Sequence, residues 1–315
     1  MAAAPSPTET ATPRAVGATT SKSPGWRTVA LFLLPALLLY GAFVLYPITQ
    51  SLRYSLFDWN GLGPLDSFVG IDNFTRAIRA DEFRSALGHN LFIVVVSLIV
   101  QIPFALGLAV LLNSKIRGRA AMRTIFFAPF VLSEVVTGVV WRQILRPDGL
   151  VDRVLDDVGA AGLTQGWLSN PDIVLFSLFF ILSWKYFGLH MVLMLAGLQG
   201  IPQELREAAA IDGASAWQSF RNITLPLLAP TIRVSVFLSI IGALQQFDLV
   251  WVTTGGGPIG ASSMMATFLY EQFRRGLFGY ASALSIIIFL LSLVVAILYQ
   301  RMVLRRDIEG AGAGA

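Results

Sequence analysis

The sequence predicts an all-α membrane protein with six transmembrane helices. Of its 315 residues, 55% are hydrophobic and 13% are charged, whereas about 25% of the residues in soluble domains are charged. The chain also contains six apolar runs of about 20 residues or more, the length at which a helix crosses the hydrocarbon core of a bilayer. This composition argues against a soluble protein with a large apolar core.

The first apolar run follows a polar N-terminal segment. Residues 1–26 are rich in Ala, Pro, Ser and Thr, which predicts a disordered tail. The run from Val29 to Ile48 is longer than the apolar part of a signal peptide, so we expect an uncleaved first span. A membrane domain is expected over residues 27–305, followed by a short tail at 306–315. The other expected spans are His89–Leu112, Met122–Leu145, Ile173–Leu198, Leu228–Val252 and Phe278–Val303.

The distribution of Lys and Arg predicts that both termini are cytoplasmic. The loop Asn113–Arg123 contains four basic residues and no acidic residue, and Arg301, Arg305 and Arg306 follow the last span. The loops at 49–88 and 146–172, on the other side of a six-span arrangement, are mixed or acidic. Basic loops stay in the cytoplasm, so the segment 199–227, between the fourth and fifth spans, is also expected there.

Several classes of function are disfavoured by missing residues. The chain has no cysteine, which excludes disulfides, thiolate metal sites and cysteine nucleophiles. His89 and His190 are too few and too far apart to indicate a metal cluster. The sequence has no G-x-x-x-x-G-K-[ST] phosphate loop, no basic soluble domain that would bind nucleic acid, and no recognisable acid–base pair of a membrane enzyme. We therefore expect a chain that is not an enzyme and holds no cofactor.

A polar insert interrupts this apolar chain. The stretch EAAAIDGASAWQSFRNITLP (Glu207–Pro226) predicts a short helix after Pro202, a break at Gly213, and a second short helix that Pro226 closes. Ser215 and Gln218 have the spacing of a capping box. A narrow face of the first helix consists of Leu205, Ala208, Ala209 and Asp212. Because small residues allow close approach, we favour a docking element for a cytoplasmic partner over a helix lying on the membrane surface, which would carry more basic and bulky apolar residues.

The insert resembles the EAA loop in permease subunits of bacterial ABC importers. In that pattern Glu-Ala-Ala, a Gly after three residues, and Ile-x-Leu-Pro after nine more are fixed, and the chain has Glu207, Ala208, Ala209, Gly213, Ile223, Leu225 and Pro226. The segments VGIDNFTRAI (Val69–Ile78) and QQFDLVWVTTGGGP (Gln245–Pro258) are similar to the carbohydrate-uptake branch, specifically its maltose-type first permease subunit. The resemblance covers residues 27–305 and implies the type I ABC importer permease fold.

The resemblance implies a function and a set of partners. It implies import of a sugar or small oligosaccharide across a bacterial plasma (inner) membrane, with the EAA loop forming a coupling helix that docks in a cleft of an ATP-binding subunit. The implied partners are a second homologous permease subunit, a dimer of the ATPase, an extracytoplasmic substrate-binding protein, the sugar and membrane lipid. ATP and Mg²⁺ would then be bound by the ATPase, because this chain has no phosphate loop.

Polar residues within the apolar spans are the candidates for a substrate pathway. Aromatic rings can stack on a sugar and amides can bond its hydroxyls, and the resemblance places sugar-lining positions in the fourth and fifth spans. The alternative is hydrogen bonding between helices without substrate contact, which we favour for Gln101 and Asp248; for Glu134 and Lys185 both interpretations stay open. The candidates are Trp184, Lys185, Tyr186, His190, Gln245 and Gln246.

Two other functions remain as alternatives. The same family could import another solute, such as glycerol phosphate or an amino acid, but a phosphate would require basic residues in the pathway and Lys185 is the sole candidate. A proton-coupled secondary transporter could instead use the intramembrane carboxyl groups of Glu134 and Asp248.

Overall fold

The computed structural model describes residues 26–114 and 116–304 and divides the chain into two compact units, 1–49 and 50–315. The N-terminal helix consists of α1 (Trp26–Tyr40), the π-helical turn η1 (Gly41–Leu45) and α2 (Tyr46–Tyr54). Its spanning part, Val29–Tyr54, contains the expected first span and extends beyond it. Most of the two expected tails lies outside the described residues, so their assignment stays a prediction.

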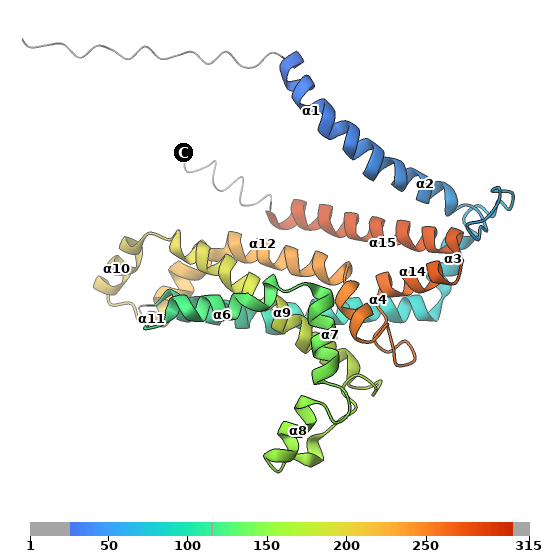
Figure 1. Cartoon of the computed structure of the whole chain (residues 1–315). Helices are drawn as coiled ribbons and strands as arrows, with labels where there is room; N and C mark the ends of the chain where they lie inside the picture. The colour runs from blue at the N-terminus through green and yellow to red at the C-terminus, as the bar shows by residue number, and fades with distance from the viewer. Residues whose placement is uncertain (1–25, 115, 305–315) are drawn as a thin grey trace, which may run out of the picture. The chain divides into compact units, whose positions relative to one another are not determined.

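Four long helical spans form the bundle of the second unit, and Figure 1 shows them side by side. They confirm the expected second, fourth and sixth spans, and the fifth in part. The spans are Asp81–Asn113, Val174–Gln199, Ala216–Leu244 and Phe278–Val303. They are built from α4 (Asp81–Val96), η2 (Ser97–Gln101) and α5 (Ile102–Asn113), from α9 (Val174–Gln199), from α11 (Ala216–Ser219), η4 (Phe220–Thr224) and α12 (Leu225–Leu244), and from α15 (Phe278–Tyr299) with η5 (Gln300–Leu304).

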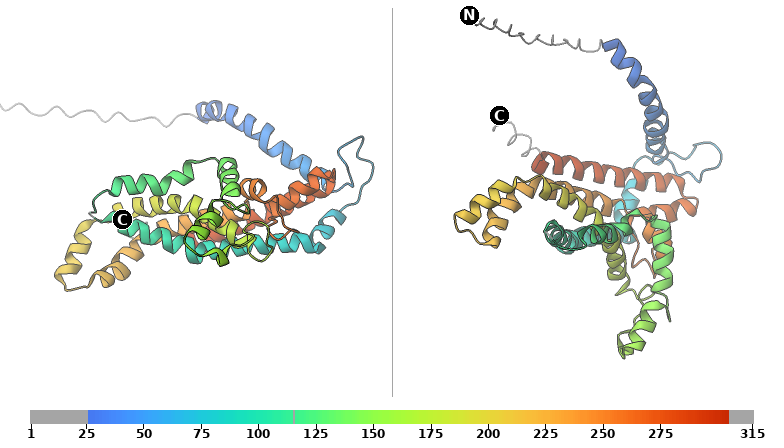
Figure 2. Two further views of the ribbon diagram at one scale, coloured as in Figure 1. Left: turned by 60° about the horizontal axis from the view of Figure 1, so that its bottom comes forward. Right: turned by 60° about the vertical axis from the view of Figure 1, so that its left-hand side comes forward.

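Short helices lie at the two ends of this bundle. The insert forms α10 (Gln203–Ile211) and α11 at one end, whereas α3 (Asp72–Arg79) and α14 (Met265–Arg274) lie at the opposite end (Figures 1 and 2). Within the described residues the β structure is limited to one isolated bridge, between Phe57 and Phe68. The all-helical prediction is therefore confirmed.

The expected third span, Met122–Leu145, is broken into two helices. α6 (Arg119–Val131) and α7 (Glu134–Ile144) are bent by 97° relative to each other, and Figure 1 shows α7 turning away from α6 toward α8 (Leu150–Asp157) and the 3₁₀ turn η3 (Ala161–Leu163). The linking residues Leu132 and Ser133 have extended backbone, with ψ of 143° and 144°. The prediction of one continuous helix is wrong here, and the described residues contain five long spans, or six if the bent pair is counted as one.

The fifth span also differs from its expected range, Leu228–Val252. At its start, Pro226 does not end the second helix of the insert, because α11, η4 and α12 form one helix. The wide π turn before the proline, in which Leu225 N–H bonds the Phe220 carbonyl, allows the helix to pass through it. At its other end α12 stops at Leu244, and α13 (Asp248–Thr253) starts after three residues that lie outside both helices.

The helices of the bundle are held together by close packing against α9. A Cβ atom on Gly188 of α9 would overlap the carbonyl oxygen of Phe126 in α6, so the two backbones touch at this glycine. Ala105 and Ala109 of α5 are fully buried in a cluster with Met191 and Met194 of α9. Small residues therefore set the spacing of the helices around α9, as is common in membrane bundles.

Candidate functional site

The insert has the helix–break–helix structure that its sequence predicts. α10 ends at Ile211, Gly213 has a φ of +81°, and Ser215 starts α11. Both bonds of the capping box are formed: Gln218 N–H donates to Ser215 Oγ over 3.3 Å, and Ser215 N–H donates to Gln218 Oε1 over 2.7 Å. A positive φ is readily adopted by glycine, so Gly213 fixes the angle between the two helices.

The exposed surface of the insert differs from the expected small-residue face. Glu207, Ala208, Asp212 and Gly213 are exposed, but Ala209 is buried against the rest of the chain. Gln203 Nε2 donates a hydrogen bond to the Glu207 carboxylate over 2.6 Å. Three large apolar side chains are also exposed on the insert, namely Ile211 at 87%, Trp217 at 66% and Leu205 at 43%. Leu205 belongs to the expected face. The exposure of Ile211 was not anticipated, although a helical wheel that included it could have revealed it.

A second group of interacting polar residues lies where the third span is broken. The Nζ atom of Lys185, in α9, donates a hydrogen bond to the carbonyl oxygen of Leu132 over 2.5 Å, and Lys185 is only 3% exposed. This carbonyl is one of those left without a helical partner at the end of α6. Lys185, on a neighbouring helix, therefore supplies the hydrogen bond that the Leu132 carbonyl lacks at the break in the third span.

The next residue along α9 binds the other side of the same break. The hydroxyl of Tyr186 donates a hydrogen bond to the carboxylate of Glu134, the first residue of α7. Gln246, between α12 and α13, donates from Nε2 to the same carboxylate over 3.4 Å. Glu134 thus joins the two chain breaks, which are more than a hundred residues apart in sequence.

The helices beyond the two breaks, α7 and α13, pack against each other. A Cβ atom on Gly138 of α7 would lie 2.9 Å from Cγ1 of Val252, at the close-contact point of the pair. Arg142 Nη1 also donates to the Val252 carbonyl over 3.3 Å. The two short helices therefore form one packed element next to the breaks.

A cavity of about 310 Å³ opens at these breaks, and we call it the central cavity. Its walls come from the middle of the α4–α5 span, from α9, from the end of α12 and from both breaks. Its size lies at the lower end of the range of about 300–1,000 Å³ that is usual for small-molecule sites. Its polar lining residues are Ser97, Gln101, Glu134, Tyr186, His190, Ser239, Gln245, Gln246 and Asp248.

Three of these polar residues are buried and lack partners. Gln101 is 5% exposed, and its amide makes no hydrogen bond within the described parts of the chain. The hydroxyls of Ser97 and Ser239 likewise have no partner among those residues, and none of these polar atoms is fully enclosed by protein. They are therefore accessible from the cavity. Such groups can bond a polar occupant with several hydroxyl groups or water molecules.

The structure brings together some of the predicted pathway residues and separates others. Tyr186, His190, Gln245 and Gln246 line the central cavity, and His190 Nδ1 is hydrogen-bonded with Ser235 Oγ at 2.6 Å. Trp184 and Lys185 do not line it: Trp184 packs edge-on against Trp141, with 5.3 Å between the ring centroids. Gln101, Glu134 and Asp248, which the sequence did not assign to the pathway, do line it. Their polarity at membrane depth was the available signal.

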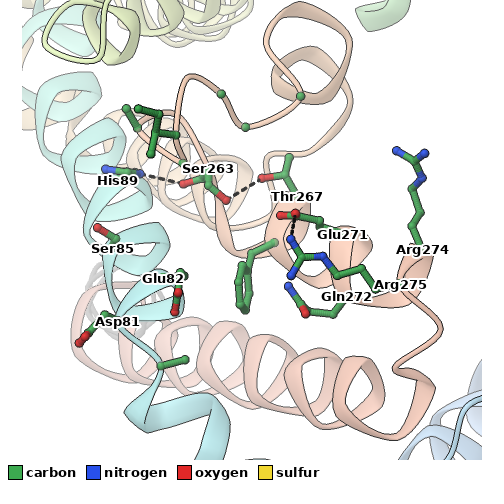
Figure 3. Close-up of a pocket in the computed structure, with 18 of the residues that line it drawn as sticks. Asp81, Glu82, Ser85, His89, Ser263, Thr267, Glu271, Gln272, Arg274 and Arg275 are labelled. Carbon is green, nitrogen blue, oxygen red and sulfur yellow. Dashed lines mark hydrogen bonds and ion pairs between the residues drawn. The ribbon is translucent and has the colours of Figure 1, made fainter.

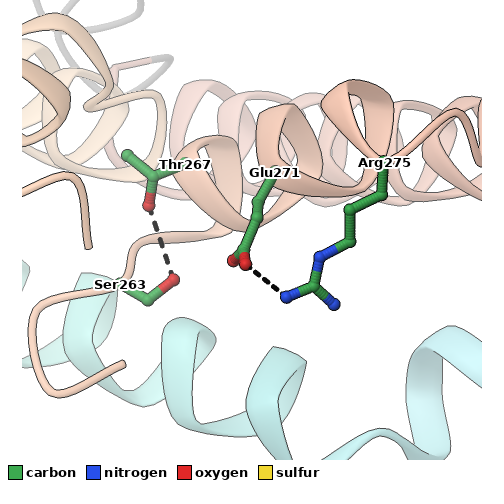
Figure 4. Close-up of polar contacts among 4 residues, drawn as sticks. All are labelled: Ser263, Thr267, Glu271 and Arg275. Carbon is green, nitrogen blue, oxygen red and sulfur yellow. Dashed lines mark hydrogen bonds and ion pairs between the residues drawn. The ribbon is translucent and has the colours of Figure 1, made fainter. Parts of the chain in front are cut away.

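A larger pocket of about 870 Å³ lies at the end of the bundle opposite the insert, between α4 and α14. We call it the α4–α14 pocket; Figure 3 shows Asp81, Glu82, Ser85 and His89 on one wall and α14 side chains on the other. His89 Nδ1 is hydrogen-bonded with the Ser263 carbonyl at 2.8 Å, and Figure 4 shows the Glu271–Arg275 ion pair, with 2.5 Å between Oε1 and Nη2. Its charged side chains are three acidic and three basic, namely Asp81, Glu82, Glu271, Arg76, Arg274 and Arg275.

The described part of the chain contains no cluster of potential metal ligands. No group of three or more His, Asp or Glu side chains lies close enough there to hold a metal ion. The Gly-rich stretch after α13 forms a turn, in which Gly255 and Gly256 have positive φ values of 63° and 87°.

The chain is similar in sequence to known membrane transport proteins. Residues 101–307 match the family described as "Binding-protein-dependent transport system inner membrane component". The chain is 34% identical to the trehalose/maltose transport system permease protein MalF of Thermococcus litoralis, over 86% of this chain and 92% of that protein. It is also 34% identical to the lactose transport system permease protein LacF of Rhizobium radiobacter, over 87% and 92% of the two chains.

A solved structure has the same fold. A chain of a bacterial ABC transporter that imports the acidic polysaccharide alginate superimposes with a TM-score of 0.78 at 24% identity, covering 89% of this chain and 96% of that one. The expected family is therefore confirmed both by sequence and by fold. The chain belongs to the inner-membrane components of binding-protein-dependent transport systems, the ABC importer permeases that the insert at Glu207–Gly213 indicated.

Proposed function

We propose that the chain is the permease subunit of an ABC importer that moves a sugar or small oligosaccharide into the cytoplasm. The main support for this proposal is the central cavity. It lies at the broken helices of the bundle and presents amides and hydroxyls without protein partners, which can bond the hydroxyls of a sugar. The transport functions of the two relatives, for trehalose/maltose and for lactose, support the same class of substrate.

The other subunits of the importer are separate chains. ATP and Mg²⁺ bind to two copies of an ATPase subunit, because this chain has no phosphate loop. A second, homologous permease subunit completes the pathway, and a binding protein delivers the sugar from outside. A related alginate transporter has been solved with its periplasmic protein bound, and in our proposal the α4–α14 pocket belongs to the face that receives such a protein.

The insert connects the ATPase to the cavity. In the proposed cycle, closure of the ATPase dimer moves α10 and α11, with Trp217 and Ile211 as the exposed apolar anchors. Because α11 and α12 form one continuous helix, this movement reaches the end of α12, where Gln245 and Gln246 line the cavity. The element of α7 and α13 then changes its position, and the cavity opens alternately to each side.

Sugar-stimulated ATP hydrolysis by the reconstituted complex tests the proposal. We expect Glu207→Lys to abolish the stimulation, because it reverses a charge on the exposed face of α10. The matched control is Glu204→Lys, one turn earlier and also exposed. Uptake that persists after removal of the ATPase subunits would contradict the proposal and favour a proton-coupled transporter.

Import of a phosphorylated solute is a weaker alternative. Lys and Arg are absent from the described lining of the central cavity, and the nearest lysine, Lys185, is bonded to the Leu132 carbonyl. A phosphate group within the membrane would need such a partner.

A further inference from the structure

We infer that Glu134 and Asp248 make the central cavity a charge filter, so that it admits uncharged or cationic saccharides and excludes saccharides with carboxylate, sulfate or phosphate groups. This inference rests on the proposed function and names the substrate class of the same site. Both carboxylates line the cavity, one at each chain break. Charges of one sign in a cleft with low-dielectric walls raise the potential that an entering ion experiences.

No Lys or Arg side chain lines the described cavity wall beside these carboxylates. Lys185 lies one residue from Tyr186, yet its ammonium group is turned to the Leu132 carbonyl and does not line the cavity. The two donors to Glu134, the Tyr186 hydroxyl and the Gln246 amide, are uncharged groups. They orient the carboxylate and do not neutralise it, whereas the Lys185 ammonium interacts electrostatically with Glu134 and offsets part of its charge. Asp248 lines the cavity with no Lys or Arg in the described wall.

An independent feature indicates that the cavity holds a polar occupant. The amide of Gln101 is nine-tenths buried, lines the cavity, and has no partner in the described chain. An amide both donates and accepts hydrogen bonds, and so does a sugar hydroxyl. The hydroxyls of Ser97 and Ser239 repeat this arrangement on two other helices.

The α4–α14 pocket at the other end of the bundle shows the contrast. Its three carboxylates are matched by the three guanidinium groups of Arg76, Arg274 and Arg275. Charge selection is therefore assigned to the central cavity, where no Lys or Arg lines the described wall beside the two acidic groups.

The filter can be measured directly, because the chain contains no cysteine. A single cysteine is placed by Gly242→Cys, since a Cβ atom there meets nothing within 4 Å and the residue lines the cavity. The complete reconstituted complex is treated with anionic, cationic and uncharged methanethiosulfonate reagents. Labelling of the complex with the cysteine-free chain is subtracted, and each rate is divided by the rate with a free thiol.

We expect the normalised cationic rate to exceed the anionic rate by about tenfold or more, as unit charges a few ångströms apart in a protein imply. Glu134→Gln combined with Asp248→Asn should lower this ratio several-fold, because both changes remove charge and keep an acceptor oxygen. The control is Ile259→Cys, a fully exposed loop position outside the central cavity. There the two neutralising changes should leave the ratio unaltered.

Two results would overturn the inference. One is a ratio close to one at Gly242→Cys, or a ratio that the neutralised double variant does not change. The other is a cysteine that no reagent modifies, the uncharged one included, because a filter must be open to solutes. A high ratio in a complex whose ATP hydrolysis no sugar stimulates would uphold the charge filter and reject the proposed function.

Discussion

The insert and the central cavity are formed in opposite ways. The insert is one stretch of chain, and its capping box, its glycine break and its two helices depend on residues a few positions apart. The cavity is lined by three spans and two chain breaks, and one bond across it, between Gln246 and Glu134, joins residues 112 positions apart. Damage to the insert should therefore stay local, whereas damage to the contacts around the cavity should reach the whole bundle.

The largest effect is expected from Gly188→Ala. The new methyl group would overlap the Phe126 carbonyl oxygen, and backbone cannot move aside as a side chain can. Overpacking costs about 1–3 kcal/mol or more, so thermal unfolding of the purified complex should shift down by several degrees. Gly242→Ala, with open space around its Cβ atom, is the matched control. Equal unfolding temperatures for the two variants would show that α6 and α9 are not in backbone contact.

Lys185→Met should have the next largest effect. It keeps the volume of the side chain but leaves the Leu132 carbonyl unsatisfied at the break, which costs about 1.5–3 kcal/mol for a bond to a charged donor. We expect reduced thermal stability together with a loss of sugar uptake, measured in liposomes. Arg84→Met removes an exposed cation that is paired with Asp81 and should change stability by less than about 1 kcal/mol. Similar losses in both variants would remove the special role of Lys185.

Gly213→Ala should affect the insert and spare the bundle. At a φ of +81°, a Cβ atom costs about 1–2 kcal/mol, which should change the angle between α10 and α11. We expect a several-fold loss of sugar-stimulated ATP hydrolysis, with an unchanged unfolding temperature. Gly107→Ala in α5, which also meets no neighbour, provides the control. A lowered unfolding temperature in the first variant would mean that the insert is part of the bundle's core.

The smallest effect is expected from Ser215→Ala. It removes the side-chain oxygen that caps α11, a change of about 0.5–2 kcal/mol in helix stability. Hydrogen exchange should increase at the amides of α11 and remain unchanged in α9. Ser219→Ala, at the other end of the same short helix and without a capping role, serves for comparison. Faster exchange in α9 would show that the cap supports more than its own helix.

Two of the predicted spans, the third and the fifth, are broken in the structure, and the cause is the same at both. The second, fourth and sixth spans follow from apolar length, because a helix satisfies its own backbone inside a membrane. The third span breaks at Leu132, whose carbonyl is bonded by Lys185 of α9. The fifth span ends at Leu244, and the carbonyl of Ala243 in its last turn accepts a hydrogen bond from Asn90 of α4 over 2.6 Å. Hydropathy cannot locate such breaks, since the partners lie on other helices.

The polar residues near the cavity also divide into those that the sequence predicted correctly and those that only tertiary contacts could place. Tyr186, His190, Gln245 and Gln246 were predicted from polarity and resemblance, and they line the central cavity. Lys185 was predicted with them, but its side chain is committed to the break. Glu134 was left undecided because its neighbours could not be placed from sequence, and only the bend at residues 132–133 brings it to Tyr186 and Gln246.

The sequence by itself determined the class of the protein, its family and the structure of its insert, because these depend on composition and on short-range spacing. The tertiary structure decided where two spans break, which polar groups face the central cavity, and that no Lys or Arg lines its described wall beside the two carboxylates. The physical reason is that a carbonyl freed inside an apolar bundle must find a donor. That donor is chosen by packing between distant segments, here by Lys185 and Asn90.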